Sequence, residues 1–83
     1  MFYVYVLQSL KDKKLYIGFT TDLRKRLKDH NAGGSKSTSP RRPLMLIFYE
    51  AYISEKDARR REKYLKTTKG KKGLKLMLAD SIS

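Results

Sequence analysis

The segment from residue 2 to residue 19 constrains the fold most, because it holds two short runs typical of a β-hairpin. The run FYVYVLQ at 2–8 is apolar, β-branched and aromatic, and LYIGF at 15–19 has the same character. The polar segment SLKDKK between them is suited to a turn. The sequence therefore predicts two antiparallel strands at the start of the chain.

The two faces of this hairpin differ in character. Successive side chains of a strand point to opposite faces, so Val4 and Val6 share one face and Tyr5 lies on the other. In the second strand Tyr16 and Gly18 fall together, opposite the aliphatic side chains. We expect a sheet with one aliphatic face and one phenolic face.

A helix is predicted from the segment TTDLRKRLKDHN that follows the hairpin. Thr20 or Thr21 can cap its first turn, and Asp22 suits the positive end of the helix dipole. Asn31 and the glycines after it end the helix. The next segment, AGGSKSTSPRRP at 32–43, is a long loop with embedded cations, and such length in a small domain indicates functional use.

The remaining elements complete an α+β pattern. Residues 44–52, LMLIFYEAY, are the most apolar run and predict a third, well-buried strand. A second helix is expected from the N-cap Ser54 to Lys66; TTKGKKG then interrupts, and a third helix covers roughly residues 73–80. The order β-β-α-β-α-α predicts one α+β domain over residues 1–83, with a three-stranded antiparallel sheet flanked by helices.

Length and cysteine content narrow the class of protein. A chain of 83 residues is expected to form one small domain with a thin core. The absence of cysteine excludes disulfides and thiolate ligands and fits a reducing compartment. No apolar run approaches the ~18 residues that cross a bilayer, and the first residues lack the basic segment of a secretory signal. These features predict a cytoplasmic protein with no membrane partner.

The charge predicts the partner. Twenty Lys and Arg against eight Asp and Glu give a net charge of +12, which indicates a polyanion, most readily a nucleic acid. The alternative is a solvated basic surface that assists solubility. This alternative applies to the net charge of the protein and to each candidate cation taken singly. The candidate phosphate contacts lie in the long loop, the second helix and the segment after it: Lys36, Arg41, Arg42, Arg59, Arg61, Lys69, Lys71 and Lys72.

Two polar residues of the first helix do not lie on its solvent face. At about 100° per residue, Arg26 and His30 flank the stripe formed by Leu23 and Leu27, so they point toward the sheet. Arg26 could simply cover the core with its aliphatic stem. His30 could simply interact with the carboxyl-terminal end of the helix dipole. The alternative is that both serve a site.

The second helix presents one carboxylate on its inward-leaning side. Glu62 falls beside the apolar stripe of Ala58 and Leu65, among several cations. It could be the ion-pair partner of those neighbours, or it could hold a divalent cation beside a bound phosphate. Mg²⁺ suits one or two carboxylates completed by waters and phosphate oxygens.

The hairpin also carries a glycine that needs an explanation. Tyrosines in strands usually pack in the core or across strands. Gly18, however, lies two residues after Tyr16 on the phenolic face, where a glycine indicates that another group approaches the backbone closely. A phosphate or the Arg26 guanidinium could be that group.

With these residues in place, the sequence resembles the GIY-YIG nuclease superfamily, and most of all its small stand-alone bacterial members. The tripeptide YVY at 3–5 stands at the family's first motif, with tyrosine in place of glycine, and YIG at 16–18 is the second. By this resemblance Arg26 takes the place of the catalytic arginine, His30 that of a frequent accessory histidine, and Glu62 that of the metal-binding glutamate.

The resemblance implies metal-assisted hydrolysis of phosphodiester bonds in DNA, rather than RNA, in repair or recombination. It implies one Mg²⁺ or Mn²⁺ ion on Glu62 and no small-molecule cofactor, and a weak homodimer could extend the footprint. The alternatives are a nucleic-acid-binding domain with little turnover, or an accessory protein bound to RNA or a repair complex. The implied catalytic residues are Tyr5, Tyr16, Arg26, His30 and Glu62, with Gly18 making room.

Overall fold

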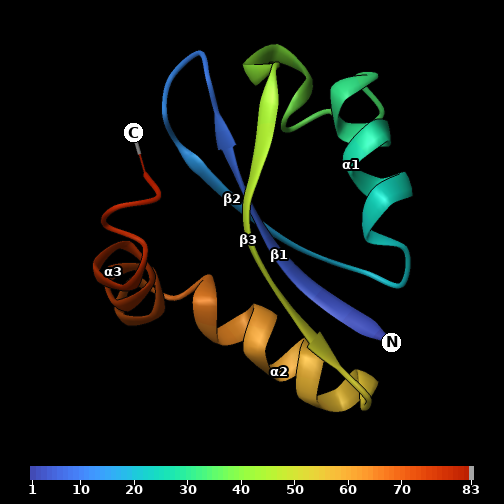
Figure 1. Cartoon of the computed structure of the whole chain (residues 1–83), viewed down its shortest axis with the longest axis vertical. Coiled ribbons are helices and arrows are strands. Elements are labelled where there is room, and N and C mark those ends of the chain that lie inside the picture. The colour runs from blue at the N-terminus through green and yellow to red at the C-terminus, as the bar shows by residue number, and fades with distance from the viewer. Residues whose placement is uncertain (83) are drawn as a thin grey trace.

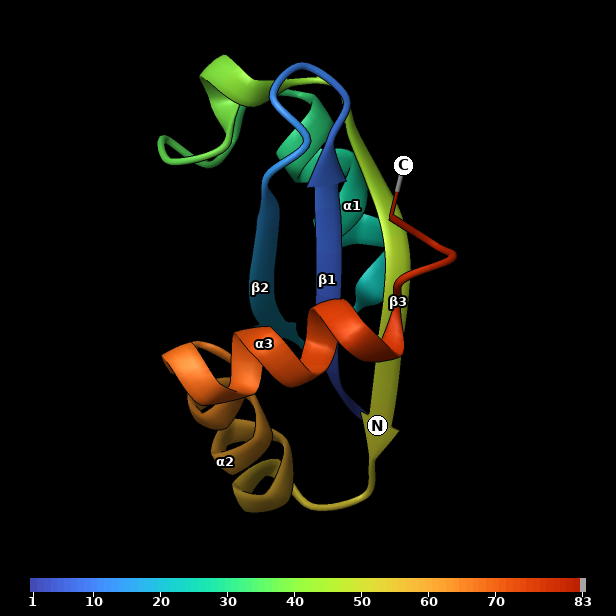
Figure 2. The ribbon, with the colours of Figure 1, turned by 90° about the vertical axis from the view of Figure 1, so that its left-hand side faces the viewer.

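Three antiparallel strands form the centre of the molecule. The computed structural model describes residues 1–82; Ser83, the last residue of the predicted domain, lies outside the described residues. The strands are β1 (Phe2–Ser9), β2 (Leu15–Thr20) and β3 (Leu44–Tyr52) (Figure 1). Their order in the sheet is β2-β1-β3, which Figure 2 shows. The predicted α+β fold with a three-stranded antiparallel sheet is confirmed.

Helices cover both faces of this sheet. Helix α1 (Leu23–Asn31) lies on one face, and α2 (Glu55–Leu65) and α3 (Thr68–Met77) lie on the other (Figure 2). Within residues 1–82, no helix is long and apolar enough to cross a membrane.

The alternation of β1 divides the core in two, as the sequence predicts. Val4 and Val6 pack with Ala58, Leu65 and other aliphatic side chains beneath α2 and α3. On the opposite face the buried residues are Tyr5, Leu7 and Leu44, against which Leu23 and Leu27 of α1 pack. One face is thus aliphatic, and the other combines aliphatic groups with a phenol.

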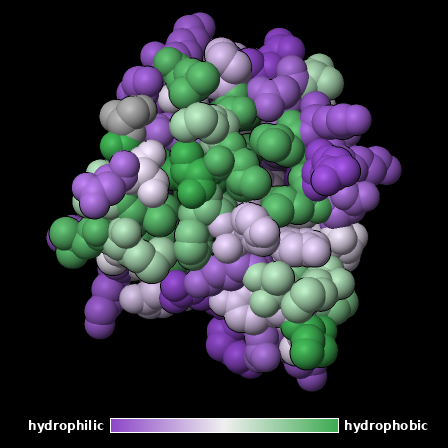
Figure 3. All heavy atoms as spheres, in the orientation of Figure 1, coloured by the Kyte–Doolittle hydropathy of each residue, from purple (hydrophilic) through white to green (hydrophobic). Residues whose placement is uncertain are grey.

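Residues 44–52 form the predicted third strand, but the prediction that this strand is well buried was wrong. β3 is an edge strand in which only Leu44 is buried, whereas Met45 and Tyr49 are exposed. Hydrophobic side chains accordingly gather on the side of the molecule where β3 runs in front (Figure 3). The buried strand is β1, because only the central strand of three has a neighbour on both sides.

Side-chain caps set the starts of the first two helices. The Asp22 side chain, rather than Thr20 or Thr21, accepts the hydrogen bond from Lys25 N at 3.1 Å and caps α1. Ser54 caps α2 as predicted, with its side chain accepting from Asp57 N.

The third helix begins five residues earlier than the sequence indicates. TTKGKKG was expected to interrupt, but α3 starts at Thr68 and is capped by the Thr67 side chain, which accepts from Gly70 N at 3.0 Å. A Cβ at Gly70 would overlap the Tyr64 carbonyl oxygen. Glycine here permits close packing of α3 on the end of α2, and this tertiary contact overrides its low helix propensity.

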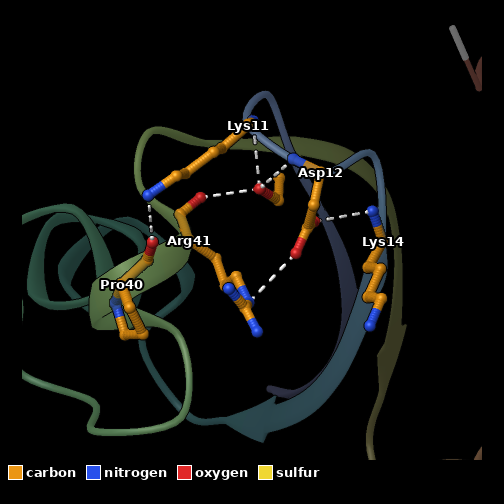
Figure 4. Close-up of polar contacts among 6 residues, drawn as sticks. Lys11, Asp12, Lys14, Pro40 and Arg41 are labelled. Carbon is orange, nitrogen blue, oxygen red and sulfur yellow. Dashed lines mark hydrogen bonds and ion pairs between the residues drawn. The ribbon is translucent and has the colours of Figure 1, made fainter.

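The long loop at 32–43 is attached to the β1–β2 turn. It contains a short 3₁₀ helix, Ser39–Arg41, and Gly33 adopts a φ of +86° that favours glycine. Three of the contacts drawn in Figure 4 join the loop to the turn. Ser9 Oγ donates to Arg41 O at 2.7 Å, Lys11 Nζ donates to Pro40 O at 3.3 Å, and Arg41 and Asp12 form an ion pair at 3.0 Å. Within the turn itself, Ser9 Oγ accepts from Asp12 N at 3.2 Å.

Candidate active site

The phenol of Tyr5 stands at the centre of the candidate site. Tyr5 lies on the central strand opposite Gly18 of β2, and it is 4% exposed. A Cβ at Gly18 would overlap the Tyr5 hydroxyl and ring. The group that approaches Gly18 is therefore Tyr5 itself, not a phosphate or Arg26 as the sequence suggested. The glycine lets the phenol lie across β2.

Helix α1 brings an imidazole and a guanidinium to this phenol. Tyr5 Oη and His30 Nε2 are 2.8 Å apart, and the two rings meet edge to face with centroids 5.8 Å apart. Arg26 Nε donates to Tyr5 Oη at 3.3 Å. The two polar residues that flank the leucine stripe of α1 thus both contact Tyr5.

The second nitrogen of His30 contacts a residue that the sequence analysis missed. His30 Nδ1 and Thr38 Oγ1 are 2.8 Å apart, and Thr38 is 2% exposed. Only the unusual length of the loop at 32–43 pointed to this region, and nothing in the sequence singles out this threonine. Burial, and then the positive charge of Arg26, hold the pKa of His30 below its ordinary value, so the ring is neutral near pH 7.

A cavity of about 240 Å³ is lined by residues from five parts of the chain: β1, β2, α1, the loop at 32–43, and α2 with its C-cap. It lies at the β2 edge of the sheet, so α2 on the aliphatic face can reach it as well as α1 on the other. The structure brings every predicted catalytic residue to it, and loop residues and the lysine that caps the end of α2 also line it. The lining residues with polar side chains, together with Gly18, are Tyr5, Tyr16, Gly18, Arg26, His30, Ser35, Ser37, Thr38, Glu62 and Lys66.

Glu62 is the acidic group of this cavity, and two cations hold it. Its side chain is 17% exposed and pairs with Lys66 Nζ at 3.0 Å and with Arg59 Nη1 at 4.0 Å. Among residues 1–82 no three acidic or histidine side chains cluster in a way that could hold a metal ion. The donor set fits a Mg²⁺ ion bound through one carboxylate, waters and phosphate oxygens, and does not fit an ion caged by protein ligands alone.

Comparison with known proteins agrees with this geometry. A model of the GIY-YIG catalytic domain matches residues 1–75. The chain belongs to the GIY-YIG family. A UPF0213 protein of Staphylococcus haemolyticus is 42% identical over 76 residues, which cover 90% of this chain and 92% of the relative. A UPF0213 protein of Clostridium perfringens is 41% identical over 83 residues, covering 99% of this chain and 88% of that one.

A solved structure supports the same assignment. The solution NMR structure of a UPF0213 protein from Bacillus halodurans is similar with a TM-score of 0.57 and 37% identity, over 93% of this chain and 85% of that one. The membership of the GIY-YIG family predicted from the sequence is therefore confirmed, and the domain is of nuclease type.

The predicted phosphate contacts of this GIY-YIG domain fall into two groups. Several of the arginines are engaged within the protein. Arg41 pairs with Asp12, Arg42 Nε donates to Ser39 O at 2.8 Å, Arg61 pairs with Glu50 at 3.0 Å, and Arg59 pairs with Glu55 and lies 3.7 Å over the Phe19 ring. The partners of Arg41 and Arg61, and the Phe19 ring beneath Arg59, are distant from these arginines in the sequence. No local sequence pattern therefore reveals these contacts.

The lysines are exposed and differ in their distance from the GIY-YIG cavity. Lys36 lies between Ser35 and Ser37, which line that cavity, whereas Lys71 lines a separate hollow beside α3. Lys69 and Lys72 are exposed on α3. Lys66, which the sequence analysis did not consider, lines the cavity directly.

Proposed function

We propose that this protein is a metal-dependent endonuclease that hydrolyses phosphodiester bonds in DNA. The observation that carries the proposal is the convergence of phenols, a guanidinium, an imidazole and a carboxylate on one small cavity. Phosphodiester hydrolysis needs an activated water, compensation of charge on the phosphate and help for the leaving oxygen. This set of side chains supplies groups for each of these tasks.

Tyr5 and His30 activate the water. Its oxygen attacks phosphorus while one of its protons moves to Tyr5 Oη, and the phenolic proton moves to His30 Nε2 at 2.8 Å. The tyrosine thus relays a proton and does not need to become a free phenolate. Tyr16, on the same face of the hairpin, contributes a second hydroxyl to the water and phosphate.

Arg26 and Glu62 manage the charge on the phosphate. The guanidinium of Arg26 pairs with the non-bridging oxygens as negative charge builds on them. As the phosphorus–oxygen bond breaks, its electron pair stays on the leaving oxygen, which takes a proton from solvent. Glu62 would hold the Mg²⁺ or Mn²⁺ ion, whose charge stabilises the phosphate and the departing oxygen. Lys66, which is half exposed, exchanges its bond to Glu62 for one to the phosphate.

The basic surface provides the affinity for the DNA backbone. If about five phosphates are neutralised, the logarithm of the binding constant falls against the logarithm of salt concentration with a slope of about −4 to −5. We expect low sequence preference, because no stretch of the sequence is typical of a major-groove recognition helix, so the structure rather than the sequence of the DNA would select the target, as in repair or recombination.

A binding domain with little turnover is the second candidate. The observation that favours it is the ion pairing of Glu62 with Lys66 and Arg59, which occupies the carboxylate that the metal needs. The two candidates bind nucleic acid alike and differ in the rate of cleavage, so cleavage and not binding separates them.

The test is a cleavage assay on linear, nicked, branched and single-stranded DNA with Mg²⁺, with Mn²⁺ and with a chelator. We expect cleavage that needs the metal and that falls about 10²–10³-fold in Glu62→Gln. Glu55→Gln is the matched control, because Glu55 is an exposed carboxylate on the same helix that also pairs with Arg59. Full activity of Glu62→Gln in Mg²⁺ would refute the metal assignment, and binding without cleavage in the unmodified protein would favour the binding domain.

A further inference from the structure

The buried polar network of the site extends one residue beyond Tyr5 and His30. Thr38 precedes the 3₁₀ helix Ser39–Arg41 in the position of an N-cap, yet its side chain makes no capping hydrogen bond. Its hydroxyl lies instead 2.8 Å from His30 Nδ1. The nitrogen of a neutral imidazole that carries the proton is set by the hydrogen bonds of both ring nitrogens, and Thr38 supplies the partner at Nδ1.

The hydrogen-bond partners favour one arrangement of protons. A guanidinium only donates, so Arg26 Nε uses an acceptor position on Tyr5 Oη and leaves the phenolic hydrogen to be donated. A phenol ionises far more readily than an aliphatic hydroxyl and is the stronger donor, so Tyr5 donates to His30 Nε2. The neutral ring then carries its hydrogen on Nδ1, and Thr38 Oγ1 accepts it.

We propose that Thr38 is a positioning residue that keeps the proton of His30 on Nδ1, so that Nε2 is free to take the phenolic proton of Tyr5. The inference rests on the proposed nuclease function for its catalytic consequence, but the proton position is a property of the protein alone. With the proton on Nε2 instead, His30 would donate to Tyr5 and could not accept from it.

The loop is held in a way that fits this role. The contacts of Arg41 and Pro40 with the β1–β2 turn fix the segment just after Thr38 (Figure 4). The residue before the loop is joined to the residue after it, because the Asn31 side chain accepts from Leu44 N at 2.8 Å and donates to Leu44 O at 3.0 Å. Both ends are thereby tied to the sheet, and the Thr38 hydroxyl has a defined place beside the ring.

NMR of the single histidine tests the proposal directly. Because His30 is the only histidine, imidazole nitrogen signals of a labelled protein need no assignment. We expect the unmodified protein to carry the hydrogen on Nδ1, and Thr38→Val, which keeps the shape but loses the acceptor, to shift the ring toward the Nε2–H form. Thr38→Ser, which retains the hydroxyl, should restore the original form. A hydrogen on Nε2 in the unmodified protein overturns the proposal even if Thr38→Val fails to fold.

The titration of His30 provides the second readout. Loss of the acceptor for Nδ1–H disfavours the imidazolium, so the pKa of His30 should move further down in Thr38→Val and return in Thr38→Ser. The acid limb of the pH profile for cleavage should move in parallel, with a rate about 10–100-fold lower at its optimum. The charged and titratable groups that face the ring or share its cavity are Tyr5, Tyr16, Arg26, Asp29, Glu62 and Lys66.

The outcomes separate this inference from the proposed function. An unchanged tautomer and pH profile in Thr38→Val, with cleavage intact, overturns the role of Thr38 and leaves the nuclease standing. If none of the proteins cleaves DNA, the nuclease fails, and the NMR comparison of the Val and Ser variants still decides whether Thr38 fixes the proton.

Discussion

The two faces of the sheet use the same central strand for different purposes. Toward α2 and α3, Val4 and Val6 of β1 contribute to a core of aliphatic side chains. Toward α1, Tyr5 is also buried but takes part in a chain of hydrogen bonds with His30 and Thr38. A domain this small has a thin core, so one face must supply the apolar burial that allows the other to bury polar groups.

The comparison predicts that changes on the two faces have separable effects. Substitutions on the aliphatic face should reduce the free energy of unfolding and leave the geometry around Tyr5 intact. Substitutions at the cavity should reduce cleavage and change stability little, except where they leave a buried polar atom without a partner.

The largest effect is expected for Arg26→Ala. Removal of a charge-stabilising group from the cavity should lower the cleavage rate about 10²–10³-fold, while the thermal unfolding midpoint changes little because Arg26 is only half buried. Arg24→Ala is the control, since Arg24 lies on the same helix but is exposed and outside the cavity. Equal losses of cleavage in the two variants would show that α1 contributes general charge and not a specific contact.

Leu65→Ala tests the aliphatic face. Leu65 is 2% exposed in the core beneath α2 and α3, so its truncation should cost about 2–5 kcal/mol of unfolding free energy, measured by urea denaturation. The folded fraction should keep the imidazole signals of His30 unchanged. A changed His30 spectrum in the folded protein would mean that the two faces are coupled, and the division described above would fail.

A pair of glycines on α3 sharpens the comparison within the aliphatic face. Gly70→Ala should destabilise by about 1–3 kcal/mol, because its Cβ meets the Tyr64 carbonyl oxygen. Gly73→Ala has nothing within 4 Å of the new Cβ and should stabilise by about 0.5–1 kcal/mol through helix propensity. Urea midpoints measure both. A destabilising Gly73→Ala would indicate that residue 73 does not lie in the interior of a helix.

Local patterns in the sequence predicted part of this arrangement. Alternation in the hairpin assigned Val4 and Tyr5 to opposite faces, and the helical period directed Arg26 and His30 toward the sheet. Both rules depend only on backbone geometry within one element, and they therefore hold before the elements are packed.

The features that could not be predicted depend on packing between elements. The approach of Tyr5 to Gly18 requires the strand register, and the helical conformation of Gly70 requires the contact with Tyr64. Composition made residues 44–52 look buried, but the order of strands placed them at an edge. Thr38 has no local signal at all, because its role arises from a loop folding back over a helix.

The smallest effect is expected for the change of unfolding free energy with pH. It should arise from His30, on the face of the sheet that carries Tyr5. The pKa of His30 is lowered in the fold, chiefly by burial and then by Arg26, so the unfolded chain binds its proton first, near pH 6.5. Below that pH the unfolded state holds more protons than the folded state. The unfolding free energy should therefore decrease as the pH falls from about 6.5 toward the lower folded pKa.

Urea midpoints at pH 7.5 and pH 5.0 measure this decrease. His30→Gln lacks the titration and should show a smaller decrease over the same interval, whereas Leu65→Ala should show the decrease of the unmodified protein from a lower starting value. The interval avoids the titration of Asp12, whose pKa is lowered from an already acidic value, chiefly by the backbone hydrogen bond from Lys14. If the unmodified protein and His30→Gln lose the same stability, His30 does not titrate differently in the folded state, and the polar face is more open to water than its burial indicates.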